Sequence, residues 1–151
     1  MKIENPKDLI IQNFKLASKA IIRLKQSLKK APVEKDLFTD EEWETIDALT
    51  SRYARASDIL FNKVFRSIDH LEFSEGGTLL DVANRSEKRG IIESVREMRE
   101  LKDIRNEISH EYAEEDMIDF YKEILKASKV LLEIYERTAS YLISHYNIKL
   151  Q

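Results

Sequence analysis

Apolar residues recur at spacings of three and four along most of this chain, and no other feature restricts its possible folds as strongly. An α-helix turns once in about 3.6 residues, so this spacing places apolar side chains on one face of a helix. The first stripe comprises Ile10, Phe14, Ala17, Ile21, Leu24 and Leu28. The second comprises Trp43, Ile46, Leu49, Tyr53, Ala56, Leu60, Val64, Ile68 and Leu71. Both stripes predict long amphipathic helices.

The ends of these two helices carry recognisable signals. Asn5-Pro6 predicts the first start, because asparagine is a favoured N-cap and proline fits the first helical position. The first helix should end at Ala31-Pro32, since a residue before proline avoids the α conformation. Thr39, followed by a glutamate at the third position after it, matches a capping box and predicts the second start. Gly76-Gly77 predicts the second end.

Three further helical segments are predicted in the second half of the chain. Residues 78–90, TLLDVANRSEKRG, form a short amphipathic piece that Thr78 can cap and Gly90 can close. The next stripe comprises Ile91, Val95, Met98, Leu101, Ile104 and Ile108. The acidic cluster at 114–116 favours a new helix start through the helix macrodipole. The last stripe comprises Met117, Tyr121, Ile124, Leu131, Tyr135 and Leu142.

These segments predict an all-α fold. With only 3 glycines and 2 prolines in 151 residues, the chain has little turn chemistry for a many-stranded sheet. No repeat and no linker divides the sequence, so residues 1–151 are expected to form a single helical domain. Long and medium helices joined by short connections favour an antiparallel four-helix bundle with one additional short helix.

The overall composition excludes several classes of protein. The chain has no cysteine, so it holds neither a disulfide nor a thiolate zinc site. It has 25 basic and 28 acidic residues, a net charge of −3, so nucleic acid would have to contact a local site rather than a generally basic surface. No apolar run approaches the roughly 20 residues of a membrane span, and no signal-peptide core is evident. We therefore expect a cytoplasmic protein without membrane contact.

The stretch DIRNEISHEY, residues 103–112, contains an arginine, an asparagine, a histidine and a tyrosine close together, a combination that could form a chemical site. Arg105 and His110 are five residues apart, which on an ideal helix separates them by roughly 140° around the axis. They can converge only if the helix loosens or ends near Ser109. Asn106 and Ser109 are then suited to satisfy the backbone groups left unpaired at that junction.

Histidine and arginine together suit metal-independent cleavage of RNA. His110 can remove the proton of a ribose 2′-hydroxyl, and Arg105 can stabilise the pentacovalent phosphate that forms. One copy lacks a second proton carrier for the leaving oxygen, and a homodimer that joins two motifs would supply it. No metal is predicted, because no second ligand stands at the helical spacing of a zinc site, and no phosphate-binding glycine-rich loop or cofactor is expected.

Structural interpretations stand beside this one. An arginine and a histidine near a helix end often serve the fold, the histidine by complementing the helix dipole and the arginine by pairing with a carboxylate. Arg96, Arg99 and Lys102 could guide an RNA strand towards the motif, but glutamates interleave them, which is also typical of a salt-bridged solvent face.

The motif resembles the signature of the HEPN superfamily of helical bundles, which includes many RNA-cleaving toxins. The signature is an arginine, a polar residue, three further residues and a histidine, here Arg105, Asn106 and His110. Tyr112, two positions beyond the histidine, is similar to the HepT branch, whose motif reads Arg-x4-His-x-Tyr. The motif also follows a helix that begins near "RGII" and precedes the last long helix, as in that family. Glu107 and Glu111 depart from it by placing carboxylates beside the motif.

This resemblance implies a ribonuclease toxin that dimerises around the motif. It also implies a partner, a minimal nucleotidyltransferase antitoxin, that silences the toxin by adding AMP to Tyr112. Related chains are substrate-binding subunits of nucleotidyltransferases, so a non-catalytic helical binding subunit is the alternative. A helical adaptor of unrelated role is a third possibility.

Overall fold

A computed structural model of the chain describes residues 5–72, 74, 76–110 and 113–150. The regular structure within these residues is helical, without a strand, which confirms the predicted all-α class. None of the helices in this part of the chain is long and apolar enough to span a membrane.

The first helix, α1 (Pro6–Lys30), begins and ends where the sequence indicates. The Asn5 side chain caps the start by accepting a hydrogen bond from the Asp8 N–H at 3.0 Å, and Pro6 follows in the first turn. Lys29 and Lys30 lie in the last turn, where positive charge complements the helix dipole. Ala31 is extended, as expected for a residue before proline.

The second predicted helix is one continuous rod that contains a π-helical turn. It consists of α2 (Asp40–Ile59), η1 (Leu60–Val64) and α3 (Phe65–Leu71). Thr39 and Glu42 form the predicted capping box, with bonds of 3.1 and 3.0 Å. In η1 the backbone bonds reach one residue further than in an α-helix, as the Phe65 N–H donating to the Leu60 carbonyl illustrates. Apolar periodicity gave no sign of this turn.

The following two helices are shorter. In α4 (Leu79–Lys88) Thr78 is the predicted cap, and Gly90 adopts a positive φ of 78° just beyond the end. The next helix, α5 (Val95–Glu107), begins later than its stripe suggests, so the prediction that Ile91 lies on this helix is wrong. Ser94 caps α5 by accepting from the Glu97 N–H, and Ile91 is buried in the connection before it.

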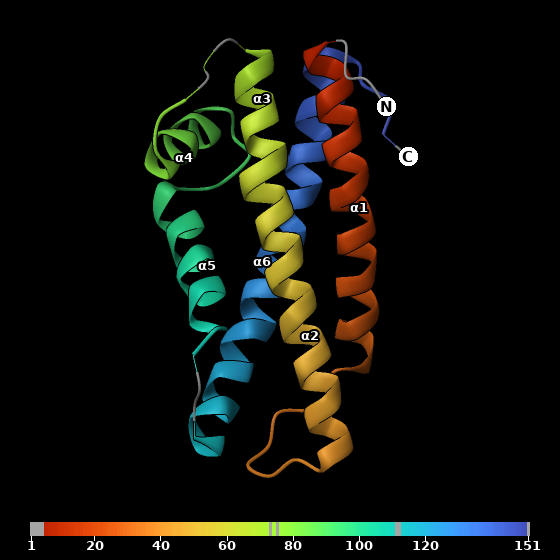
Figure 1. The fold of residues 1–151 in the computed structure, drawn as a ribbon, viewed down its shortest axis with the longest axis vertical. Helices are drawn as coiled ribbons and strands as arrows, with labels where there is room; N and C mark the ends of the chain where they lie inside the picture. The colour runs from red at the N-terminus through yellow and green to blue at the C-terminus, as the bar shows by residue number, and fades with distance from the viewer. Residues whose placement is uncertain (1–4, 73, 75, 111–112, 151) are drawn as a thin grey trace.

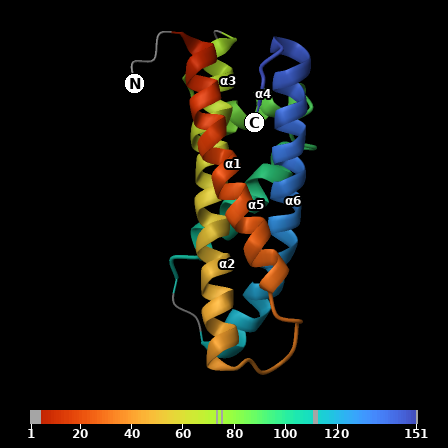
Figure 2. The ribbon, with the colours of Figure 1, turned by 90° about the vertical axis from the view of Figure 1, so that its right-hand side faces the viewer.

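The last helix, α6 (Glu114–Tyr146), is the longest and begins at the predicted acidic cluster. Figure 1 shows α1 running down the molecule, the α2–α3 rod running up beside it, α5 running down and α6 running up behind. The short α4 lies next to α3 at the upper end. Figure 2 shows the molecule as a long, narrow stack of these helices.

All predicted apolar stripes point into the core or pack against its edge. Helices from the start to the end of the chain contribute side chains that are at most 2% exposed. Examples are Leu24, Tyr53, Phe61, Val82 and Leu131. Burial of this continuous apolar surface holds the helices together, since each helix alone would be marginal in water.

Candidate functional site

The motif lies at the point where α5 ends. Glu107 is the last residue of α5, and residues 108–110 form a turn and a bend after it. The His110 N–H donates to the Glu107 carbonyl at 3.0 Å, and the Ser109 hydroxyl donates to the Asn106 carbonyl at 3.0 Å. The helix therefore ends between Arg105 and His110. Their spacing in the sequence predicted that the two side chains could converge only if the helix loosened or ended near this point. Glu111 and Tyr112 lie outside the described residues.

Arg105 is held from the side by a carboxylate on the α2–α3 rod. Its Nε donates to Asp58 Oδ1 at 2.9 Å and its Nη2 to Asp58 Oδ2 at 3.0 Å, a bidentate pair between residues far apart in the sequence. The pair is partly exposed, with 29% and 39% of the two side chains accessible. Asp58 also raises the pKa of the Arg105 guanidinium. The described bonds leave the two Nη1 hydrogens of Arg105 available to a ligand.

His110 has a different carboxylate neighbour. Its Nδ1 lies 3.3 Å from Glu107 Oε2, and both side chains are about half exposed. The bonds described for Arg105 join it to Asp58 and not to His110. The two proposed catalytic side chains thus lie at the same helix end, and none of the hydrogen bonds or ion pairs described there joins one to the other. The structural interpretation of Arg105, in which it pairs with a carboxylate, fits the geometry of a single chain. His110 lies at the C-terminal end of α5, where that interpretation put it, and also has Glu107 beside it.

A buried tyrosine fixes α5 against α2 behind this pair. The Tyr53 hydroxyl donates to the Leu101 carbonyl at 2.9 Å, and the Tyr53 side chain is fully buried. Burial raises the pKa of Tyr53. The negative charge of Asp58 also raises it, whereas the positive charge of Arg105 lowers it. Sequence reasoning assigned Tyr53 to the apolar stripe and missed Asp58. The only signal for Asp58 is a lone carboxylate at the edge of that stripe.

The three basic residues predicted to guide RNA do not share one surface. Arg96 pairs with Glu100 at 3.0 Å and is almost fully exposed. Arg99 and Lys102 instead line a hollow of about 170 Å³ between α4 and α5, together with Asn106. Its remaining walls are mostly apolar, with one carboxylate, and comprise Leu79, Leu80, Ala83, Val95, Met98 and Asp103. The salt-bridged interpretation therefore fits Arg96, whereas Arg99 and Lys102 form a separate surface next to the motif.

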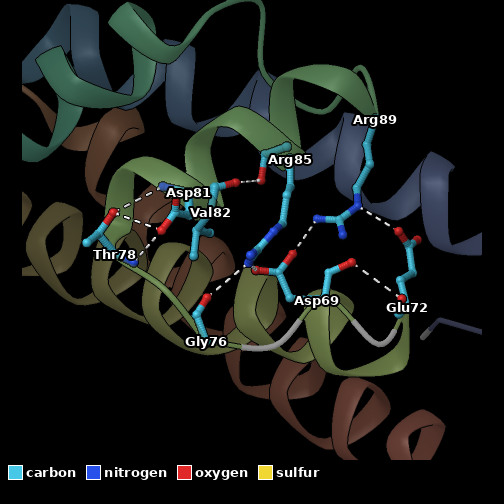
Figure 3. A network of polar contacts seen from close by, with 10 residues as sticks. Asp69, Glu72, Gly76, Thr78, Asp81, Val82, Arg85 and Arg89 are labelled. Carbon is cyan, nitrogen blue, oxygen red and sulfur yellow. Dashed lines mark hydrogen bonds and ion pairs between the residues drawn. The ribbon is translucent and has the colours of Figure 1, made fainter.

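A second polar cluster, which sequence reasoning missed, lies where α3, α4 and α6 meet. Asp69 on α3 is 3% exposed and accepts from two arginines of the α4 segment, Arg85 at 3.1 Å and Arg89 at 2.6 Å. Figure 3 shows Arg85 also reaching the Gly76 carbonyl and Arg89 also reaching Glu72. This network ties the connection between α3 and α4 to both helices.

Tyrosines from α6 complete the network. Tyr141 and Tyr146 both donate to Glu72 Oε2 at 2.5 Å. Burial raises the pKa of Glu72, but these hydroxyls and Arg89 outweigh it, so the pKa lies below its ordinary value. His145 stacks on Tyr141 with ring centroids 4.1 Å apart. The carboxylates of Asp69 and Glu72 each accept bonds from at least two donors of this cluster.

Neither relatives nor a metal site point to a function for this chain. No protein-family model, no curated protein and no solved structure matches it. In the part of the chain that the structure describes, no three histidine, aspartate or glutamate side chains gather as a metal site would require.

Proposed function

We propose that this chain is a HepT-like toxin, a metal-independent endoribonuclease that works as a homodimer through Arg105 and His110. The proposal includes an antiparallel four-helix bundle with α4 as the additional short helix. Its other parts are an RNA substrate in a cleft between two motifs, and a nucleotidyltransferase antitoxin that adds AMP to Tyr112.

One observation carries the proposal: α5 ends at Glu107, between the two residues of the motif. The end places His110 on an exposed turn, where its ring can reach a ligand, while Arg105 stays on the helix and is aligned by Asp58. A helix that continued through Ser109 would have put the two side chains on different faces.

The chemistry follows from the two side chains. His110 of one protomer accepts the proton of a ribose 2′-hydroxyl, whose oxygen attacks the adjacent phosphorus. The Nη1 hydrogens of Arg105 stabilise the negative charge on the pentacovalent phosphate. The bond from phosphorus to the 5′-oxygen then breaks, and a protonated histidine of the second protomer donates a proton to that oxygen. The products are a 2′,3′-cyclic phosphate and a 5′-hydroxyl.

Substitution of His110 tests this chemistry. His110→Ala should lower the rate of RNA cleavage by roughly 10²–10⁴-fold, the usual cost of losing general acid–base catalysis. His145→Ala is the matched control, because His145 is an exposed histidine at the other end of the molecule. Gel analysis of RNA incubated with each purified variant gives the rates. Equal cleavage by wild type and His110→Ala would exclude His110 as the base.

The homodimer has its own test. A monomeric protein offers one Arg–His pair and no acid for the leaving oxygen, so we expect a dimer at micromolar concentration. Sedimentation velocity measures this directly, and a monomer that cleaves RNA at the same concentration would contradict the shared cleft.

Modification of Tyr112 is tested by co-expression with a nucleotidyltransferase encoded beside this chain. We expect AMP on Tyr112, where a bulky anion next to Arg105 would occupy the phosphate position and repel RNA. Tyr112→Phe should fold normally and remain unmodified. Mass spectrometry locates the adduct, and AMP on another residue would overturn this role.

A non-catalytic binding subunit of a nucleotidyltransferase is the second candidate, and the Asp58–Arg105 pair favours it. The carboxylate neutralises the arginine that a transition state would need. An inactive purified protein that binds the nucleotidyltransferase would support this alternative.

A further inference from the structure

Polar residues of the α2–α3 rod face cationic residues of α5 at the motif and also beyond it. Asn62 lies one helical turn after Asp58 on the rod, and Lys102 lies one turn before Arg105 on α5. Asn62 Oδ1 is 3.4 Å from Lys102 Nζ. One turn further, Arg66 lies close enough to contribute to a lowered pKa at Lys102. The two helices run in opposite directions at this point (Figure 1), so the facing residues form two matched rows.

The π-helical turn aligns the row on the rod. Eight residues of an unbroken α-helix would rotate Arg66 by roughly 80° away from Asp58. The wider turn from Leu60 to Val64 absorbs about one extra residue and returns Arg66 to within roughly 20° of the Asp58 direction. Asn62, inside the turn, is directed to the same side, as its contact with Lys102 requires. π-Helical turns of this kind are frequent at functional sites.

Positive charge at this surface exceeds negative charge. Burial lowers the pKa of Lys102; Asp58 opposes that shift, while Arg105 and Arg66 add to it. Asp58 is already committed to Arg105. On the other side of Arg66, a hollow of about 420 Å³ lies where α3 and η1 pack against α1. Its polar lining includes Asn13, Asn62, Lys63, Arg66 and His70, and none of its lining residues carries a carboxylate.

This local excess contrasts with the net charge of −3 of the whole chain. Lys63 and Arg66 are exposed, and no ion pair is described for either in the part of the chain that the structure covers. Their charges are therefore available to an anion, unlike that of Arg96, which Glu100 already holds. A row of cations spaced by helical turns suits a polymer of phosphates better than one small anion.

We propose that Lys63, Arg66 and Lys102 form a strip that binds the phosphodiester backbone of single-stranded RNA and leads it to Arg105 and His110. The choice of RNA rests on the proposed function, whereas the strip itself rests on the geometry and charge of these side chains. Asn62 positions Lys102 between the two hollows, and Arg99 extends the strip towards α4.

Binding of a short fluorescent single-stranded RNA tests the strip. Anisotropy is measured in a His110→Ala background, so that the RNA stays intact, across a range of salt concentrations. Arg66→Ala and Lys102→Ala should each weaken binding at low salt and reduce the slope of log affinity against log salt by about 0.7 for each phosphate that is no longer neutralised. Arg96→Ala is the matched control and should leave the slope unchanged. Circular dichroism verifies that each variant is folded, and Arg66→Gln provides a second substitution at that position.

The outcomes separate the strip from the ribonuclease. Unchanged affinity and slope in both strip variants would overturn the strip, even if wild type cleaves RNA. An equal loss of affinity in Arg96→Ala would overturn it too, because general charge would then explain binding. Strip-dependent binding by a wild-type protein that does not cleave RNA would retain the strip and overturn the ribonuclease.

Discussion

The α2–α3 rod carries two aspartates that bind arginine, Asp69 at its upper end and Asp58 beside the motif end of α5, yet they differ in burial and in the number of their partners. At the upper end, 4% of the Asp69 side chain is exposed, and it binds both Arg85 and Arg89. At the motif end, 39% of the Asp58 side chain is exposed, and the one ion pair described for it joins it to Arg105.

We interpret this difference as one between arginines that hold the fold and an arginine that can bind a ligand. A buried charge is tolerated only when it is paired and hydrogen-bonded, and Asp69 accepts bonds from two arginines. A partly exposed pair can keep donors for a ligand, since the bonds described for Arg105 do not use its Nη1 hydrogens. Under the proposed function, the same residue types therefore hold the fold around Asp69 and bind RNA phosphate at Arg105.

Removal of Asp69 should have the largest effect on stability. Asp69→Ala leaves the Arg89 side chain, 7% exposed, without its shortest ion pair. Breaking one side of a buried pair costs about 3–5 kcal/mol. Urea denaturation measures the free energy of unfolding. A destabilisation below about 1 kcal/mol would show that the network is as dispensable as a surface pair.

One contribution to the pH dependence of stability should come from Glu72 at the same end. Its lowered pKa means that its contribution is present above the unfolded value of about 4.3 and is lost as pH falls through the folded pKa. Glu72→Gln should cost about 1.5–3 kcal/mol at neutral pH, the range for hydrogen bonds to charged groups. The difference from wild type should shrink below about pH 4. Glu136→Gln, an exposed site, is the control, and a constant difference at all pH values would contradict the assignment.

Tyr53→Phe tests the buried support of the motif end. It removes the hydroxyl that binds the Leu101 carbonyl and should cost about 1–1.5 kcal/mol. Thermal unfolding of the two proteins gives the difference. If stability is unchanged, the anchoring of α5 to α2 rests on apolar packing alone.

Removal of Asp58 should have the smallest effect on stability. Asp58→Ala breaks a partly exposed pair worth about 0–1 kcal/mol. Binding of RNA should become tighter, because a carboxylate beside the strip is removed. A destabilisation comparable to that of Asp69→Ala would remove the distinction between the two ends.

Most helix boundaries followed from local sequence. Asn5, Thr39 and Thr78 cap helices as predicted, and the apolar stripes lie in the core or at its edge. The start of α5 was misplaced, because Ile91 is buried like a helix residue although it belongs to a connection. Periodicity reports burial and does not distinguish a buried loop residue from a helical one.

For the candidate site, the sequence was enough to identify Arg105, His110 and a helix end near Ser109, because a cap, a periodicity and a rare histidine are all local features. Only the tertiary structure could decide that Asp58, 47 residues from Arg105, is its partner, and that Arg66 lies near enough to Lys102 to lower the pKa of that lysine. The Asp69 network was equally invisible, since its members come from α3, α4 and α6. Pairing between distant residues depends on how helices pack and where a π-helical turn shifts a face, and neither leaves a local pattern in the chain.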